Sequence, residues 1–128
     1  MLNRRRMGEA QQITADRRRR EDEAPRLRDE VPHLVSLGLE IDEGRAGREL
    51  AGATHIRRIV VEHAPALFVV PCGGSDCKGG AHDITHVIMR ALRQGQTRFE
   101  GESACDGSTN AAACPCVVRY VGTATYKA

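Results

Sequence analysis

The sequence predicts an α+β domain in which a small antiparallel sheet of about four strands packs against one amphipathic helix, in the order β-β-β-α-β. Three observations lead to this prediction. Apolar and polar residues alternate in segments 34–42 and 117–126, and apolar residues recur at helical spacing in segment 84–92. All five cysteines fall between residues 72 and 116, and we expect them to anchor the domain through a zinc-knuckle-like loop.

The length and composition of the chain favour one small domain with a cross-link. The chain has 128 residues, with only four aromatic residues and no tryptophan. A short chain with a core of small aliphatic side chains is only marginally stable without a cross-link. We therefore expect residues 31–128 to form a single zinc-stabilised domain that follows an N-terminal tail, residues 1–30.

The expected tail is rich in arginine and poor in apolar residues. Residues 1–20 contain seven arginines against two acidic residues, a local charge of +5, whereas residues 21–30 carry −3 and the remainder is neutral. The few apolar side chains of the tail do not share one face, so burial cannot offset the entropy of ordering. We expect this segment to be disordered or to form a solvated helix.

The first predicted strand spans residues 34–42. Its apolar residues alternate with polar ones, which indicates a strand with one solvated face. The apolar positions are Val35, Leu37, Leu39 and Ile41.

Two further strands are predicted before the helix. Residues 54–62 are rich in β-branched residues, and residues 67–70 are apolar at every position, as in a strand at the centre of a sheet. The intervening residues 63–66 include Pro65 and are expected to form a hairpin turn.

Residues 84–92 carry the clearest helical pattern. Apolar residues recur there at intervals of three and four, which defines one buried face. Asp83 is placed to accept backbone N–H bonds at the start of the helix, and Gly95 to end it in a left-handed conformation.

The final strand is predicted over residues 117–126. It follows a long loop that opens with a short strand at residues 97–100 and needs its cysteines to hold it in place.

The five cysteines form two sequence clusters, C-x4-C and C-x8-C-x-C. Structural zinc sites use four tetrahedral ligands, commonly two pairs from separate loops. Glycines in the first cluster let the backbone curl so that both sulfurs face one point. The arrangement resembles a zinc ribbon in this respect, although its second cluster departs from the paired C-x2-C pattern. The predicted ligands of a structural Zn²⁺ are Cys72, Cys77, Cys105 and Cys114.

Three other side chains are alternative ligands. Cys116 is either a spare thiol or a substitute for Cys105. His82 and His86 are four residues apart, but only His86 falls within the predicted helix, on its polar face, where a solvated histidine is the commoner finding. His82 adjoins the glycine-rich loop and is the better alternative, because mixed Cys/His zinc sites are common.

The same loop is compatible with three other functions. Cys72 and Cys77 could form a reversible disulfide, although their spacing is not the C-x-x-C of thioredoxin-like proteins. Cys77 with a histidine base could be a nucleophile, but no third catalytic residue or oxyanion loop is recognisable, so an enzyme is not expected. The glycines ahead of the helix could bind an anion, yet they match no phosphate-binding motif, and Asp83 would repel one.

These features predict a zinc-binding module that binds nucleic acid or a ribonucleoprotein through its basic tail, since arginine contacts to phosphate give affinity independent of base sequence. The alternatives are a zinc-stabilised module for protein–protein interaction and a thiol redox protein. A cytoplasmic location is expected, because no segment resembles a signal peptide or membrane span and cytosolic thiols stay reduced. No small-molecule substrate or membrane partner is inferred. The predicted nucleic-acid contacts are Arg4, Arg5, Arg6, Arg17, Arg18, Arg19 and Arg20.

Overall fold

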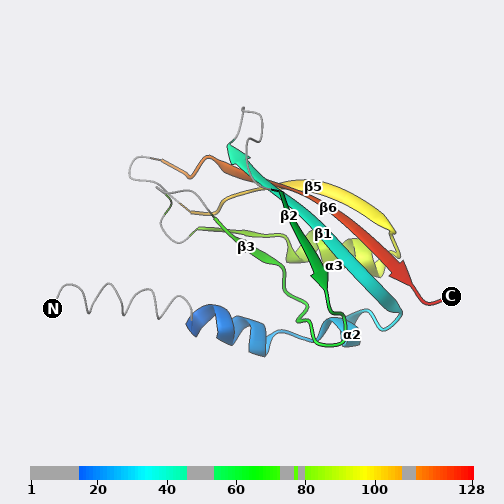
Figure 1. The fold of residues 1–128 in the computed structure, drawn as a ribbon. Helices are drawn as coiled ribbons and strands as arrows, with labels where there is room; N and C mark the ends of the chain where they lie inside the picture. The colour runs from blue at the N-terminus through cyan, green and yellow to red at the C-terminus, as the bar shows by residue number, and fades with distance from the viewer. Residues whose placement is uncertain (1–14, 46–53, 73–76, 78–79, 108–111) are drawn as a thin grey trace.

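The structure is a computed structural model that describes residues 15–45, 54–72, 77, 80–107 and 112–128 (Figure 1). A helical segment, residues 15–23, comes first. It is followed by α2 (Leu27–Glu30), β1 (Leu34–Arg45), β2 (Thr54–Ile59), β3 (Val69–Pro71), β4 (Ala81–Asp83), α3 (Thr85–Arg93), β5 (Arg98–Ala104) and β6 (Cys116–Tyr126). The chain is thus of the α+β class with a small antiparallel sheet, as predicted. None of the helices in the described ranges has the length and apolar character needed to cross a bilayer.

Four strands form the main sheet, in the order β2-β1-β6-β5, and each neighbouring pair is antiparallel. The central pair is the longest, because β1 and β6 run side by side from Leu34 opposite Tyr126 to Arg45 opposite Cys116. Glu43, near the end of β1, lies opposite Val118, near the start of β6. The end of β1 and the start of β6 therefore meet at one end of the sheet, where the cysteines gather.

Helix α3 lies across one face of the main sheet (Figure 1). Its buried residues are Ile88, Met89, Ala91 and Leu92, which join the aliphatic residues of β1 and β6 in one core. Val87 was expected on the buried face, but its side chain is 44% exposed. Met89 is buried instead, because residues 25–30 cover that side of the helix, where Arg93 of α3 forms an ion pair with Glu30 at 3.1 Å.

The C-terminal end of α3 agrees with the sequence pattern, and its start differs from it by one residue. The carboxylate of Asp83 accepts a hydrogen bond from the backbone N–H of Thr85 at 3.1 Å, which satisfies one of the free donors of the first turn. Gly95 has a φ of 71°, the left-handed conformation that ends many helices. The N-cap is nevertheless Ile84 and not Asp83, so the helix begins one residue later than predicted and ends at Gly95 as predicted.

The start of β1 differs from the predicted alternation. The pairing of β1 with β6 is irregular between Leu34 and Ser36, so the strand changes face there. Leu34 is buried in the core, and Val35, which was expected to be buried, is 53% exposed. Beyond this bulge Leu37, Leu39 and Ile41 are all buried, as predicted.

The predicted third strand is not part of the main sheet. Residues 69–71 form β3, which pairs only with β4 in a separate two-stranded sheet. The turn at residues 61–63 does not join a hairpin, because β2 pairs with β1 and not with β3. Apolar composition alone predicted a central strand, which was wrong.

The last residues of the expected tail belong to the folded body. Leu27 is fully buried, and its backbone N–H donates to the carbonyl of Ala64 at 3.0 Å. The backbone N–H of Ala66 donates to the carbonyl of Pro25 at 2.7 Å. The helical segment 15–23 is exposed along its length, and its Arg20 forms an ion pair with Asp83 at 3.5 Å. The described part of the tail is thus a solvated helix followed by a docked turn.

Candidate metal centre

Four of the five cysteines meet at one end of the molecule. Cys72 directly follows β3 and Cys77 lies in the connection to β4, whereas Cys105 directly follows β5 and Cys114 precedes β6. Their four Sγ atoms all lie within 4.8 Å of one another. The two sequence clusters each supply two sulfurs, so the four predicted ligands are brought together and could hold a metal ion.

Two sulfur–sulfur contacts join one cluster to the other. The Sγ atoms of Cys72 and Cys114 are 3.8 Å apart, and those of Cys77 and Cys105 are 3.6 Å apart. A disulfide requires about 2.05 Å, and all five cysteines are free thiols. The sulfurs are therefore grouped at non-bonded distances.

Backbone hydrogen bonds hold the two cysteine-bearing segments in place. The N–H of Cys72 donates to the carbonyl of Gly80, which closes the β3–β4 hairpin, and the N–H of Cys105 donates to the carbonyl of Cys116; both bonds are 3.0 Å long. Asp106 ties the two segments to each other. Its N–H donates to the carbonyl of Ala81 at 3.1 Å, and its carboxylate accepts the N–H of Ala81 at 2.8 Å.

Two glycines pack directly against the sulfurs. A Cβ added to Gly80 would lie 2.6 Å from Cys77 Sγ and would also clash with Cys105 Sγ. A Cβ added to Gly107 would lie 2.7 Å from Cys77 Sγ and 2.6 Å from the Cα of Gly80. The N–H of Gly107 also donates to Cys105 Sγ at 3.3 Å, the kind of bond that orients a thiolate ligand. The sequence prediction omitted both glycines, although each follows a cysteine by two or three residues.

Replacing Gly80 by alanine should disrupt the cysteine group. The added Cβ would displace two sulfurs, at an overpacking cost of about 1–3 kcal/mol, and the displaced thiols should bind metal more weakly. The matched control is Gly95→Ala, which meets no atom within 4 Å but strains a left-handed residue. We expect both variants to be less stable in urea denaturation, with metal affinity reduced only in Gly80→Ala. Equal metal affinity in the two variants would contradict this packing role.

The thiols differ in acidity. Burial raises the pKa of Cys105 to about 12 and also raises the pKa of Cys116. A hydrogen bond from the backbone of Cys116 lowers the pKa of Cys114 to about 7. Four negative thiolates would repel one another in so small a volume, so the group needs either protons or a cation.

The alternative ligands occupy three different environments. Cys116 is buried beside the site but is not part of the group of four sulfurs. His86 is exposed on α3, where its Nε2 accepts a hydrogen bond from Arg90 at 3.4 Å, and it belongs to no group of candidate ligands among the described residues. His82 is fully buried in β4 and lies in a second group of candidate ligands with Cys72 and Glu43.

The predicted nucleic-acid contacts are only partly described by the structure. Arg4, Arg5 and Arg6 lie outside the described residues. Arg17, Arg18, Arg19 and Arg20 are exposed on the helical segment 15–23. Arg19 forms an ion pair with Asp16 at 3.1 Å, and Arg20 forms one with Asp83 at 3.5 Å.

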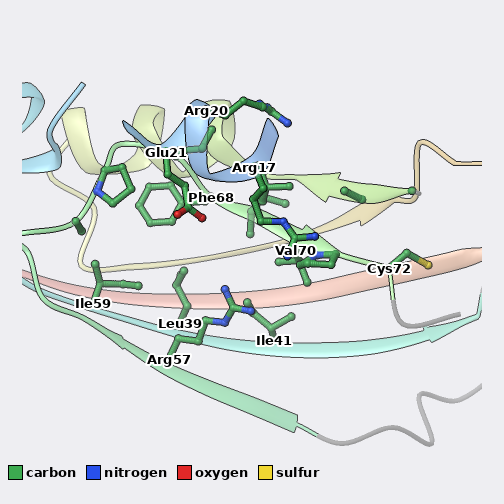
Figure 2. Close-up of a pocket in the computed structure, with 18 of the residues that line it drawn as sticks. Arg17, Arg20, Glu21, Leu39, Ile41, Arg57, Ile59, Phe68, Val70 and Cys72 are labelled. Carbon is green, nitrogen blue, oxygen red and sulfur yellow. The ribbon is translucent and has the colours of Figure 1, made fainter. Parts of the chain in front are cut away.

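A pocket of about 430 Å³ lies between the helical segment 15–23, β3 and the main sheet. Its apolar lining includes Leu39, Ile41 and Phe68. Arg17 from the helical segment and Arg57 from β2 extend into it from opposite sides (Figure 2). Within the described part of the chain, neither of these two arginines forms an ion pair.

Comparison of the chain with protein-family models, curated proteins and solved structures gave no match.

Proposed function

We propose that Cys72, Cys77, Cys105 and Cys114 bind one structural Zn²⁺ and that the chain is a zinc-stabilised module. The sulfur spacing is the observation that carries this proposal. Zinc–sulfur bonds of about 2.3 Å directed to the corners of a tetrahedron place the sulfurs about 3.8 Å apart. The two cross-cluster distances, 3.8 Å and 3.6 Å, match this value.

The donor set favours zinc in a structural role. Four thiolates are the soft ligands that zinc accepts in tetrahedral geometry, and together they leave no position for a substrate or a water. The ion would join the β3–β4 hairpin to the ends of β5 and β6. This link matters because the three buried cysteines form a cluster separate from the aliphatic core.

The test is the metal content of the untagged protein, purified under reducing conditions and measured by plasma mass spectrometry. We expect at least one zinc per chain. Replacement by Co²⁺ should give the intense sulfur-to-cobalt absorption of a four-thiolate site. Protein that contains no metal and takes up neither zinc nor cobalt would refute the proposal and would leave the thiol redox function.

A second candidate function is the binding of single-stranded nucleic acid by the arginine-lined pocket, with phosphate between Arg17 and Arg57. The observation in favour is that these two guanidinium groups share one pocket and lack ion-pair partners among the described residues. Asp16 and Glu21 also line the pocket, so its five charged side chains, including Arg20, leave one net positive charge.

Replacing both Arg17 and Arg57 by glutamine should weaken binding of a single-stranded RNA oligonucleotide in fluorescence anisotropy. Each lost phosphate contact reduces the steepness of the plot of log affinity against log salt concentration by about 0.7. The slope for the double variant should therefore be about 1.4 less steep than that for the native chain. The control is the double variant Arg28→Gln/Arg98→Gln, which removes two arginines that are exposed and paired with acidic neighbours. If the native chain shows no salt-dependent RNA binding, nucleic acid is excluded and the protein-interaction module becomes the preferred function.

A further inference from the structure

His82 is an unusual core residue. It is the one polar or charged side chain that is fully buried among the described residues, with no exposed surface. It lies in the middle of β4, opposite Val70 of β3. A buried imidazole in a short hairpin needs partners for both ring nitrogens, because an unsatisfied buried polar atom destabilises the fold.

Among the described residues, only one of the two ring nitrogens has such a partner. Nδ1 lies 2.9 Å from the backbone carbonyl oxygen of Ser103. A carbonyl can only accept, so Nδ1 must carry the proton, and in the neutral ring Nε2 is then a bare lone pair. Nε2 is buried and has no hydrogen-bond partner within the described part of the chain. A lone pair in this position is available to a cation.

The surroundings supply two further metal ligands. A ring nitrogen of His82, the Sγ of Cys72 and a carboxylate oxygen of Glu43 all lie within 4.8 Å of one another. They come from three elements, β4, the end of β3 and β1, so the fold has brought them together from distant parts of the chain. Nitrogen, sulfur and oxygen donors together suit zinc and similar divalent ions. A ring N–H donated to a backbone carbonyl is also the arrangement that commonly orients metal-binding histidines.

We propose that Glu43, Cys72 and His82 form a second metal site for Zn²⁺ or a similar divalent transition-metal ion, beside the four-cysteine centre. The thiolate of Cys72 bridges the two ions, because a thiolate sulfur has more than one lone pair. This inference rests on the proposed function in one respect, which is that Cys72 also binds the first ion. Three protein ligands leave one tetrahedral position open, unlike the closed four-cysteine site.

Charge balance favours the second ion. A divalent cation with four thiolates carries a net charge of −2, and Glu43 adds another negative charge at the same end of the sheet. A second divalent cation reduces the total from −3 to −1. Binding of the first ion releases the protons of the four thiols, and the resulting negative charge attracts a second cation to the neighbouring position.

The experiment is a Co²⁺ titration of the native chain and of two variants, followed by visible absorption and by native mass spectrometry. In His82→Asn, the amide reaches the position of Nδ1 and keeps the bond to Ser103, but nothing replaces Nε2. Glu43→Gln keeps the shape of a partly exposed side chain and removes its charge. We expect the native chain to bind two cobalt ions, His82→Asn to bind one, and Glu43→Gln to bind the second ion at least tenfold more weakly. The spectrum of the first, four-thiolate ion should be unchanged in both variants.

The other outcomes separate the two proposals. A native chain that binds one ion, with the same spectrum in His82→Asn, would refute the second site and leave the four-cysteine site intact. One ion whose spectrum changes in His82→Asn would place His82 in the first site and also refute the second. No cobalt binding at all would refute both. If His82→Asn does not fold, an unaltered second affinity in Glu43→Gln is sufficient to overturn the inference.

Discussion

Replacing Cys77 or Cys105 by serine should abolish tight metal binding and lower the melting temperature by more than about 10 °C. The free energy of zinc binding to a four-ligand site appears as folding free energy, and it amounts to about 10–16 kcal/mol in zinc-finger peptides. Here that energy would hold the β3–β4 hairpin against β5 and β6. The aliphatic core of β1, β6 and α3 forms a separate cluster, so part of the fold should survive. We therefore expect amide hydrogen exchange to accelerate most in residues 69–83.

The matched control is Cys116→Ala. This thiol is as buried as its neighbours but lies outside the group of four sulfurs, so its loss should cost only the packing of one small side chain. Zinc content, melting temperature and hydrogen exchange should be measured on all three variants. If Cys77→Ser keeps its zinc and melts at the same temperature as Cys116→Ala, the structural zinc site is wrong.

Replacing Leu27 by alanine should destabilise the protein by about 3 kcal/mol, as for other fully buried leucines. Leu27 has no exposed surface and packs into the core from a segment of the chain with the composition of a tail. In a protein of ordinary stability, this loss is a substantial fraction of the total free energy of unfolding. Urea denaturation gives the value directly.

The control for Leu27 is its neighbour Arg28→Ala, whose side chain is 60% exposed and whose replacement should change stability by less than about 0.5 kcal/mol. Should the two variants prove equally stable, residues 25–30 would not belong to the folded unit. The boundary at residue 31 that the sequence suggested would then hold.

Elements with a strong local pattern were predictable from the sequence. The spacing of apolar residues, Asp83 and Gly95 together define α3, and alternation defines β6, because both signals depend only on neighbouring residues. The bulge that exposes Val35 depends on the pairing of β1 with β6, which no local pattern encodes. The same holds for β3, whose apolar run resembles a central strand but which pairs with β4 in a separate sheet. In both cases the pairing of strands in the folded protein, and not the local pattern of apolar residues, determined the structure.

The cysteine group was predictable because thiols are rare and have few roles, so their clustering in sequence indicates clustering in space. Which of the five would be the spare was less certain, and the structure sets Cys116 apart from the other four. Neither Glu43 nor the close packing of Gly80 and Gly107 was predictable. Glu43 is one acidic residue among seventeen, and its approach to Cys72 depends on the tertiary fold.

The position of α3 between the two cysteine pairs has a consequence for folding kinetics. Cys77 and Cys105 are 28 residues apart, and Cys72 and Cys114 are 42 apart, with β4, α3 and β5 between them. A complete set of four ligands exists only after this whole segment has folded back on itself. Contacts that form after the transition state slow unfolding and leave the folding rate almost unchanged. Zinc should therefore lengthen the lifetime of the native state and have little effect on the rate at which the chain reaches it.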